Sequence, residues 1–184
     1  MSTVLIPLAQ GCEELEAVTV IDLLRRAGIT VVTAGLDKAP VKASRGVKLI
    51  PDTTLDEALK QTFDMIVLPG GLPGADHLNN DSRIHQLLQE MHQQGKYTAA
   101  ICAAPKVLAD AGLLTNKSAT SYPGVLDKMQ VPHMQFVESP VVKDGKIITS
   151  RGPGTAMDFA LELIEALVGH DTRTQVEAGL VRPN

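Results

Sequence analysis

The sequence predicts an α/β fold in which helices cover both faces of a mostly parallel sheet. Short continuous runs of Val, Ile and Leu recur along the chain, and longer amphipathic segments alternate with them. Strands that are apolar on both sides are typical of parallel sheets that are buried on both faces. No break in composition divides the 184 residues. We therefore expect one domain, residues 1–184, which is long enough to bury a full core.

The predicted elements follow in an order that suits this fold. Strands are expected at residues 3–8, 29–34, 64–68, 97–101, 118–121, 135–139, 141–143 and 146–149. Helices are expected at residues 13–27, 54–60, 82–94, 103–111 and 154–168, and a short helical tail follows the last of them. Glycine stands just after most of these helices, at positions 28, 95, 112 and 169, where it can end a helix.

Local patterns predict one cap and two hairpins. Asp52 or Thr53 is the expected N-cap of the helix at residues 54–60. Two short extended pieces, residues 41–44 and 47–50, flank Arg45 and Gly46 and predict an edge hairpin. Asp144-Gly145 between two later strands predicts a type I′ turn.

The composition argues against several classes of partner. The formal net charge is −4, and Lys and Arg are scattered, so we expect no sequence-specific binding of nucleic acid. The apolar run at the N-terminus lacks a preceding basic region, and no run approaches the length of a membrane span, so we expect a cytoplasmic protein. The two cysteines, Cys12 and Cys102, form neither a disulfide framework nor a zinc motif, which favours a reducing compartment.

Three loops leave the carboxyl ends of predicted strands, at residues 10–14, 69–74 and 102–105. Ligands of open α/β sheets bind beyond these strand ends, so we expect the three loops to converge. The chemistry that they carry is the most informative part of the sequence.

Cys102 stands on a tight turn from a buried strand into a helix, with small residues on both sides. Such a cysteine elbow would lift the sulfur above the sheet and place it near the positive end of a helix, which favours a thiolate. Lowering the pKa of a thiol by about three units requires roughly 4 kcal/mol, more than the 1–2 kcal/mol that a helix end supplies. A hydrogen bond to the charged sulfur, worth about 1.5–3 kcal/mol, would supply the rest. The alternative is a cysteine that packs as a small apolar residue.

Glu16 is the candidate for that hydrogen bond. On a helical wheel Glu13 and Glu16 fall on the apolar stripe, whereas Glu14 falls on the polar face beside Arg25. A desolvated carboxyl tends to stay protonated, and a protonated Glu16 could donate to the Cys102 thiolate. The alternative is a partly exposed glutamate whose stem covers the core.

Gly70 and Gly71 would bring bare backbone to the same place. Together with the amide of Ala103 their N–H groups could form an oxyanion hole, although a Gly-Gly pair alone also fits a plain turn. The loop matches neither a P-loop nor a dinucleotide fingerprint. None of the histidines shows the spacing of a metal pair, and we expect no metal or cofactor. His77, near the glycine loop, is the one histidine that we keep as a candidate site residue.

Several segments together resemble the ThiJ/PfpI superfamily, in its DJ-one-like branch. The resemblance extends over nearly the whole chain and rests on Gly-Cys-Glu-Glu-Leu-Glu-Ala at 11–17, Arg-Arg-Ala-Gly-Ile at 25–29, Ser-Arg-Gly-Val at 44–47, Val-Leu-Pro-Gly-Gly at 67–71, Ala-Ala-Ile-Cys-Ala at 99–103 and Thr-Ser-Arg-Gly-Pro-Gly-Thr at 149–155. It implies a flavodoxin-like three-layer sandwich and a homodimer.

The resemblance also implies roles for individual residues. The reactive cysteine of the family matches Cys102, its buried protonated glutamate matches Glu16, and its oxyanion-hole amides match Gly71 and Ala103, with Gly70 beside them. The family's pocket or dimer-side positions match Arg45, Tyr122, Gly152 and Pro153. Two features depart from relatives: Tyr122 stands where some carry a histidine before a proline, and Ala103 stands where protease-like members carry a histidine.

Two functions follow from the resemblance. The first is cysteine-dependent deglycase or glyoxalase chemistry on methylglyoxal and glyoxal adducts of proteins or nucleotides, with protection from oxidative stress. The second is a non-enzymatic redox sensor or stress chaperone that acts through oxidation of Cys102. An inert Cys102 in a scaffold protein is the third possibility.

Overall fold

The computed structural model describes residues 2–182 and confirms the predicted α/β class. A central seven-stranded sheet has the order β10-β11-β7-β6-β1-β2-β5. Its strands are β1 (Thr3–Leu8), β2 (Thr30–Gly35), β5 (Thr53–Thr54), β6 (Met65–Leu68), β7 (Tyr97–Ile101), β10 (Val141–Asp144) and β11 (Ile147–Ser150). β10 runs antiparallel to β11, and the other neighbours pair in parallel.

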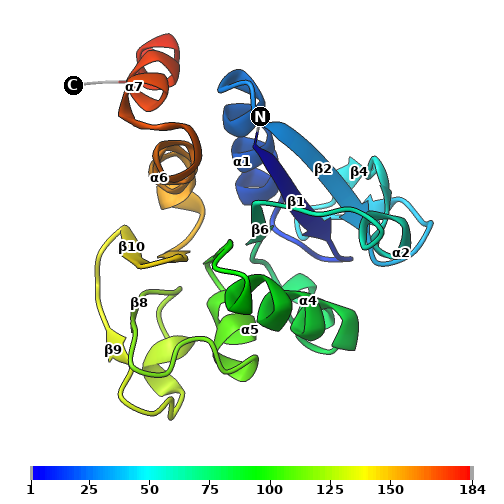
Figure 1. Cartoon of the computed structure of the whole chain (residues 1–184). Coiled ribbons are helices and arrows are strands. Elements are labelled where there is room, and N and C mark those ends of the chain that lie inside the picture. The colour runs from blue at the N-terminus through cyan, green and yellow to red at the C-terminus, as the bar shows by residue number, and fades with distance from the viewer. Residues whose placement is uncertain (1, 183–184) are drawn as a thin grey trace.

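Helices cover both faces of this sheet (Figure 1). α1 (Glu14–Arg26) and α6 (Ala156–Val168) pack together on one face, and α7 (His170–Gly179) packs against α6. The other face carries α2 (Leu55–Ala58), α3 (Gly74–Asn79), α4 (Ser82–Gln93) and α5 (Pro105–Asp110). The short 3₁₀ helices are η1 (Leu126–Lys128) and η2 (Pro153–Thr155).

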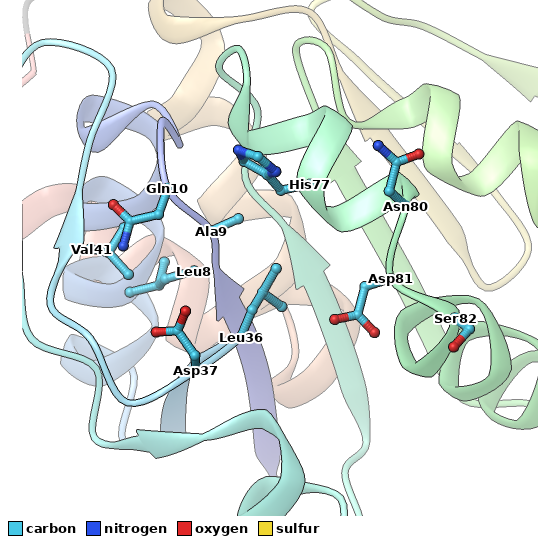
Figure 2. A pocket seen from close by; sticks show the side chains of 10 residues that line it. All are labelled: Leu8, Ala9, Gln10, Leu36, Asp37, Val41, His77, Asn80, Asp81 and Ser82. Carbon is cyan, nitrogen blue, oxygen red and sulfur yellow. The ribbon is translucent and has the colours of Figure 1, made fainter.

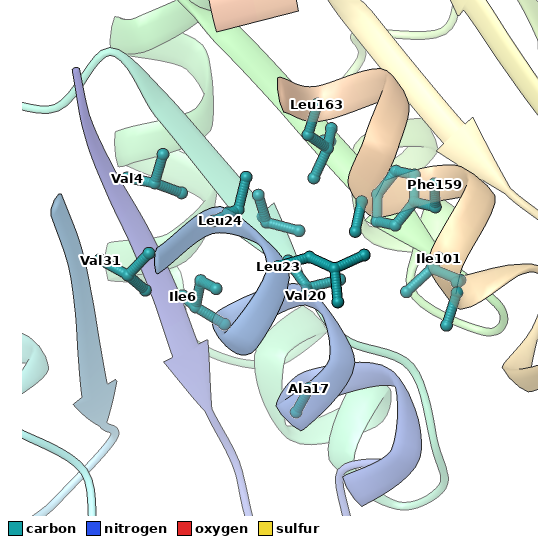
Figure 3. Packing of buried hydrophobic residues seen from close by; sticks show 14 of the residues in the cluster. Val4, Ile6, Ala17, Val20, Leu23, Leu24, Val31, Ile101, Phe159 and Leu163 are labelled. Carbon is teal, nitrogen blue, oxygen red and sulfur yellow. The ribbon is translucent and has the colours of Figure 1, made fainter. Parts of the chain in front are cut away.

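Alternate residues of each central strand fill the two cores, which explains the continuous apolar runs. In β1, Val4 and Ile6 face the α1/α6 core, and Leu5 faces the core on the other side. Figure 3 shows Val20 and Leu23 of α1 and Phe159 of α6 in the first of these cores. The register of the sheet is therefore set by burial on both faces.

Outside the central sheet, one prediction is confirmed and two are not. β3 (Val41–Lys42) and β4 (Lys48–Leu49) form the expected edge hairpin. The expected strands at 118–121 and 135–139 are wrong in extent and place, since β8 (Ser118–Ala119) and β9 (Gln135–Phe136) are short and form a separate sheet. These stretches lack the long apolar runs that hold a strand in the central sheet.

A helix cap and a turn also differ from the predictions. Thr54, and neither Asp52 nor Thr53, caps α2 by accepting a hydrogen bond from the Glu57 N–H. Asp52 instead accepts hydrogen bonds from Thr33 of β2. The turn between β10 and β11 has positive φ at Gly145 alone, so it is not type I′ but has the pattern of type II′.

Candidate active site

The three loops predicted to converge do meet at the carboxyl edge of the sheet. The Glu13 N–H donates to the Gly70 carbonyl at 2.9 Å, and the Gly74 N–H donates to the Gly11 carbonyl at 3.3 Å. A Cβ placed on Gly70 would lie 2.5 Å from the Cβ of Cys102, which joins the third loop to the other two.

Cys102 occupies a left-handed turn directly after β7. Its φ is +65°, a conformation that residues other than glycine adopt rarely and that clusters at functional sites. Two hydrogen bonds hold this backbone: the Cys102 N–H donates to the Ser150 carbonyl at 3.0 Å, and the Tyr122 N–H donates to the Cys102 carbonyl at 2.8 Å. Cys102 as a whole is 9% exposed, so the elbow leaves it nearly buried.

The helix after the elbow is shorter than predicted. α5 begins at Pro105, not at Ala103, because Pro105 takes the first helical position and Ala104 becomes the N-cap. The amide of Ala103, which lowers the pKa of Cys102, therefore lies before the helix and not in its first turn.

Glu16 projects from the first turn of α1 and is fully buried, so the partly exposed alternative is wrong. Its Oε2 accepts a hydrogen bond from the Gly70 N–H at 2.8 Å, and the neighbouring Cys102 thiol lowers the pKa of its carboxyl. The other oxygen, Oε1, has no partner of good hydrogen-bond geometry within residues 2–182. The contact between carboxyl and thiol is therefore close but poorly aligned.

Two backbone amides complete the surroundings of the sulfur. The N–H groups of Gly71 and Ala103, which come from different loops, both lower the pKa of Cys102. Side chains on the glycine loop would not fit, because a Cβ on Gly70 would lie 2.7 Å from the Glu16 Oε2 and one on Gly71 would lie 2.4 Å from the Glu13 nitrogen. Two backbone amides beside a nucleophile are the kind of donors from which an oxyanion hole is built.

The carboxyl and the thiol titrate as a pair. Burial raises the pKa of Glu16 to about 7, although the hydrogen bonds from Gly70 and Cys102 oppose the rise. Burial also raises the pKa of the Cys102 thiol to about 12, and the Glu16 carboxylate adds to this rise, whereas the amides of Gly71 and Ala103 oppose it. When Glu16 is charged, the pKa of Cys102 is raised, so the prediction that the fold lowers this pKa is wrong for that state. Between these two pKa values the pair holds one proton.

The remaining acids of α1 organise the neighbouring hairpin. Glu13 caps α1, and one of its oxygens accepts from the Ser44 hydroxyl at 2.7 Å. Glu14 accepts from the Arg45 backbone N–H at 2.9 Å, so its predicted place beside Arg25 on the polar face is wrong. Burial disfavours the charge of Glu14, but these backbone and hydroxyl hydrogen bonds lower its pKa. Arg45 therefore has a fixed backbone and an exposed side chain.

Tyr122 and Gly152 lie together beside the elbow. A Cβ on Gly152 would come within 3.3 Å of the Tyr122 ring, and Pro153 begins η2 directly after it. Tyr122 is 51% exposed, so its ring is available at the surface. Sequence reasoning missed Ser150, whose carbonyl orients Cys102; its place at the carboxyl end of β11 was the available signal.

A cavity of about 420 Å³ lies beyond the ends of β1 and β2, separate from this cluster. Its lining includes Gln10, Asp37, His77 and Asp81 and none of the residues that contact the Cys102 sulfur (Figure 2). His77 therefore does not join Cys102, although it stands near the glycine loop in the sequence. Within residues 2–182, no three His, Cys, Asp or Glu side chains are grouped to hold a metal ion.

Comparison with known proteins identifies relatives along nearly the whole chain. Residues 2–166 match the DJ-1/PfpI family. The chain is 43% identical over 180 residues to the Parkinson disease protein 7 homolog of Danio rerio. This match covers 96% of this chain and 95% of that protein. It is 38% identical over 160 residues to a Caenorhabditis elegans protein named glutathione-independent glyoxalase DJR-1.2, covering 87% of this chain and 85% of that one.

The structure agrees with the sequence comparison. The crystal structure of Drosophila melanogaster DJ-1beta matches with a TM-score of 0.94 and 44% identity, and the match covers 100% of both chains. On the evidence of both its sequence and its fold, this chain belongs to the DJ-1/PfpI family.

Proposed function

We propose that this protein is a cysteine-dependent enzyme of the deglycase and glyoxalase type, carried by one domain over residues 1–184. Its substrates would be methylglyoxal and glyoxal and their early adducts on proteins or nucleotides. The observation that carries the proposal is the packing of Gly70 between Cys102 and the buried Glu16 carboxyl, which shifts the pKa of the thiol together with the amides of Gly71 and Ala103. The name of the similar nematode glyoxalase supports the same class of reaction.

In this proposal the proton shared by the pair resides on Glu16, and Cys102 is the thiolate. The sulfur adds to the aldehyde carbon, the carbonyl electron pair moves to oxygen, and the amides of Gly71 and Ala103 stabilise the oxyanion. Glu16 donates its proton to that oxygen. As a carboxylate it then takes the proton from the first carbon, which forms an enediolate, and returns it to the second carbon, while the hydroxyl proton of the first carbon passes to the oxygen of the second. Water hydrolyses the resulting thioester, which releases lactate from methylglyoxal and restores the thiol.

Release of lactate tests this proposal. Wild type and Cys102→Ala are incubated with methylglyoxal and with its adduct on a small thiol, and lactate is measured. We expect turnover in wild type, loss of turnover in Cys102→Ala, and normal turnover in Cys12→Ala, because the Cys12 thiol is fully buried and is not among the groups that shift the Cys102 pKa. Equal lactate release by wild type and Cys102→Ala would contradict the proposal.

A redox sensor or stress chaperone is the second candidate, and the same donors favour it. Oxidation of Cys102 to the sulfinate would place new oxygens next to the amides of Gly71 and Ala103 and next to Glu16. Mass spectrometry after mild peroxide treatment measures this oxidation. Stoichiometric oxidation of Cys102 without any catalytic lactate release would favour the sensor over the enzyme.

We also propose a homodimer and a reducing compartment such as the cytoplasm. Leu15, Val18 and Val47 are each about half exposed, and the hydrogen bond from the Val47 N–H to Glu14 keeps the hairpin beside α1. We name these three residues the α1 patch; exposed apolar groups of this kind mark interfaces. Both cysteines are free, which suits a reducing environment. Within residues 2–182, no helix has both the length and the apolar character needed to cross a membrane.

A further inference from the structure

The two amides that lower the pKa of Cys102 belong to different loops, so the packing of those loops fixes their separation. The Gly71 loop follows β6 and leads into α3, and the Ala103 loop follows β7 and leads into α5. Parallel pairing of β6 with β7, from Met65↔Tyr97 to Leu68↔Ala100, fixes where both loops begin. Beyond the sheet, the relative position of the loops depends on how α3 packs against α5.

An ion pair joins the first turns of these two helices. The Lys106 Nζ donates to the Asp76 Oδ1. The Lys106 side chain is only 21% exposed, so its ammonium is held largely against the protein. A second contact lies one turn further along, where the Asn79 amide donates to the Asp110 carboxylate at 2.7 Å. Polar contacts thus connect α3 and α5 at both ends.

The ion pair is connected to each amide by short stretches of hydrogen-bonded backbone. The Ala75 N–H donates to the Gly71 carbonyl at 2.8 Å, and Asp76 is the next residue. On the other side the Ala104 N–H donates to the Ile101 carbonyl at 3.0 Å, which closes the turn around Cys102 just before Lys106. A shift of α3 relative to α5 would therefore move one amide relative to the other.

We propose that Lys106 and Asp76 are positioning residues that hold the Gly71 and Ala103 amides at the spacing needed to bind one atom between them. The inference rests on the proposed function only in assigning a catalytic use to that spacing. Neither side chain is among the groups that contact the sulfur, so both act through the backbone.

Neutral and exchanged variants test the proposal. Lys106→Met keeps the length of the side chain without its charge, Asp76→Asn keeps its shape, and the double variant Asp76→Lys/Lys106→Asp exchanges the charges. Lys60→Met is the matched control, because Lys60, two residues after the end of α2, forms an exposed ion pair with Glu57. Partly exposed ion pairs add little to stability, so all four variants should fold, which circular dichroism checks.

Two readouts are needed. The first is kcat and KM for lactate formation; the second is the rate at which iodoacetamide alkylates Cys102 as a function of pH. Removing an oxyanion donor costs about 10²–10³ in kcat, so displacing one should cost roughly tenfold, with KM changed less than about twofold. The alkylation profile should shift upward in pH, because both amides lower the pKa of the thiol.

The outcomes separate this inference from the proposed function. We expect both single variants to lose kcat and shift the alkylation profile, and the exchanged pair to recover most of each. If wild type forms no lactate but the single variants still shift the alkylation profile, the positioning role stands and the proposed function fails. If Lys106→Met matches Lys60→Met in both readouts, the positioning role is overturned.

Discussion

Replacing Glu16 reveals which atom of the buried pair carries the shared proton at neutral pH. If Glu16 is protonated and donates to the Cys102 thiolate, Glu16→Leu removes a hydrogen bond to a charged group that is worth about 1.5–3 kcal/mol. That loss raises the pKa of Cys102 by roughly one to two units. Glu16→Gln, which keeps an N–H donor of the same shape, should raise it less.

The opposite location of the proton predicts the opposite sign. If the carboxylate is charged and the thiol protonated, Glu16 raises the Cys102 pKa through both its charge and its hydrogen bond. Both variants would then lower that pKa. The direction in which the Cys102 pKa shifts therefore shows whether the shared proton lies on Glu16 or on Cys102, whatever the size of the shift.

The ultraviolet absorbance of the thiolate, followed against pH, measures this shift. Cys102→Ser supplies the background, and Cys12 contributes little because burial raises its pKa to about 12. A lower pKa in both Glu16 variants than in wild type would refute the assignment of the proton to Glu16, and with it the mechanism proposed above.

Three other perturbations give equally direct tests. Burial raises the Glu16 pKa from 4.5 to about 7, so the folded chain keeps a proton that the unfolded chain loses. As the pH rises between these two values, the free energy of unfolding of wild type should therefore fall by about 3 kcal/mol relative to that of Glu16→Gln. Urea titrations at several pH values measure this fall. Curves of stability against pH that run parallel for the two proteins would contradict the burial of the Glu16 carboxyl. Gly70→Ala should abolish rapid alkylation of Cys102, since its Cβ would lie 2.5 Å from the Cys102 Cβ; an alkylation rate equal to wild type would argue against this packing. Val18→Glu should convert a dimer to a monomer in light scattering, because Val18 lies in the α1 patch; a dimer of unchanged mass would place the interface elsewhere.

The central strands were predictable because burial on both faces leaves a continuous apolar run. β1 and β7 have the predicted bounds, Thr3–Leu8 and Tyr97–Ile101. α3 escaped prediction because Pro73 and Gly74, which signal a loop in sequence, stand at its start. β8 and β9 pair with each other outside the main sheet, and this depends on tertiary contacts rather than on local composition.

At the site, the sequence predicted which residues meet but not how they titrate. The wheel position of Glu16 left burial and partial exposure both open, and the structure shows burial with no exposed area. The same wheel misplaced Glu14, because the hairpin that covers it lies far along the chain. The rise in the Cys102 pKa also escaped prediction, since it depends on the depth of burial and on a charge from another element.

The left-handed backbone at Cys102 has a consequence for how the protein matures. Its conformation depends on the Ser150 carbonyl and the Tyr122 amide, which are both synthesised after the cysteine. A nascent chain that has not yet paired β11 with β7 lacks one of these restraints. The turn at Cys102 therefore has both of its backbone restraints only when the last strand of the sheet is in place.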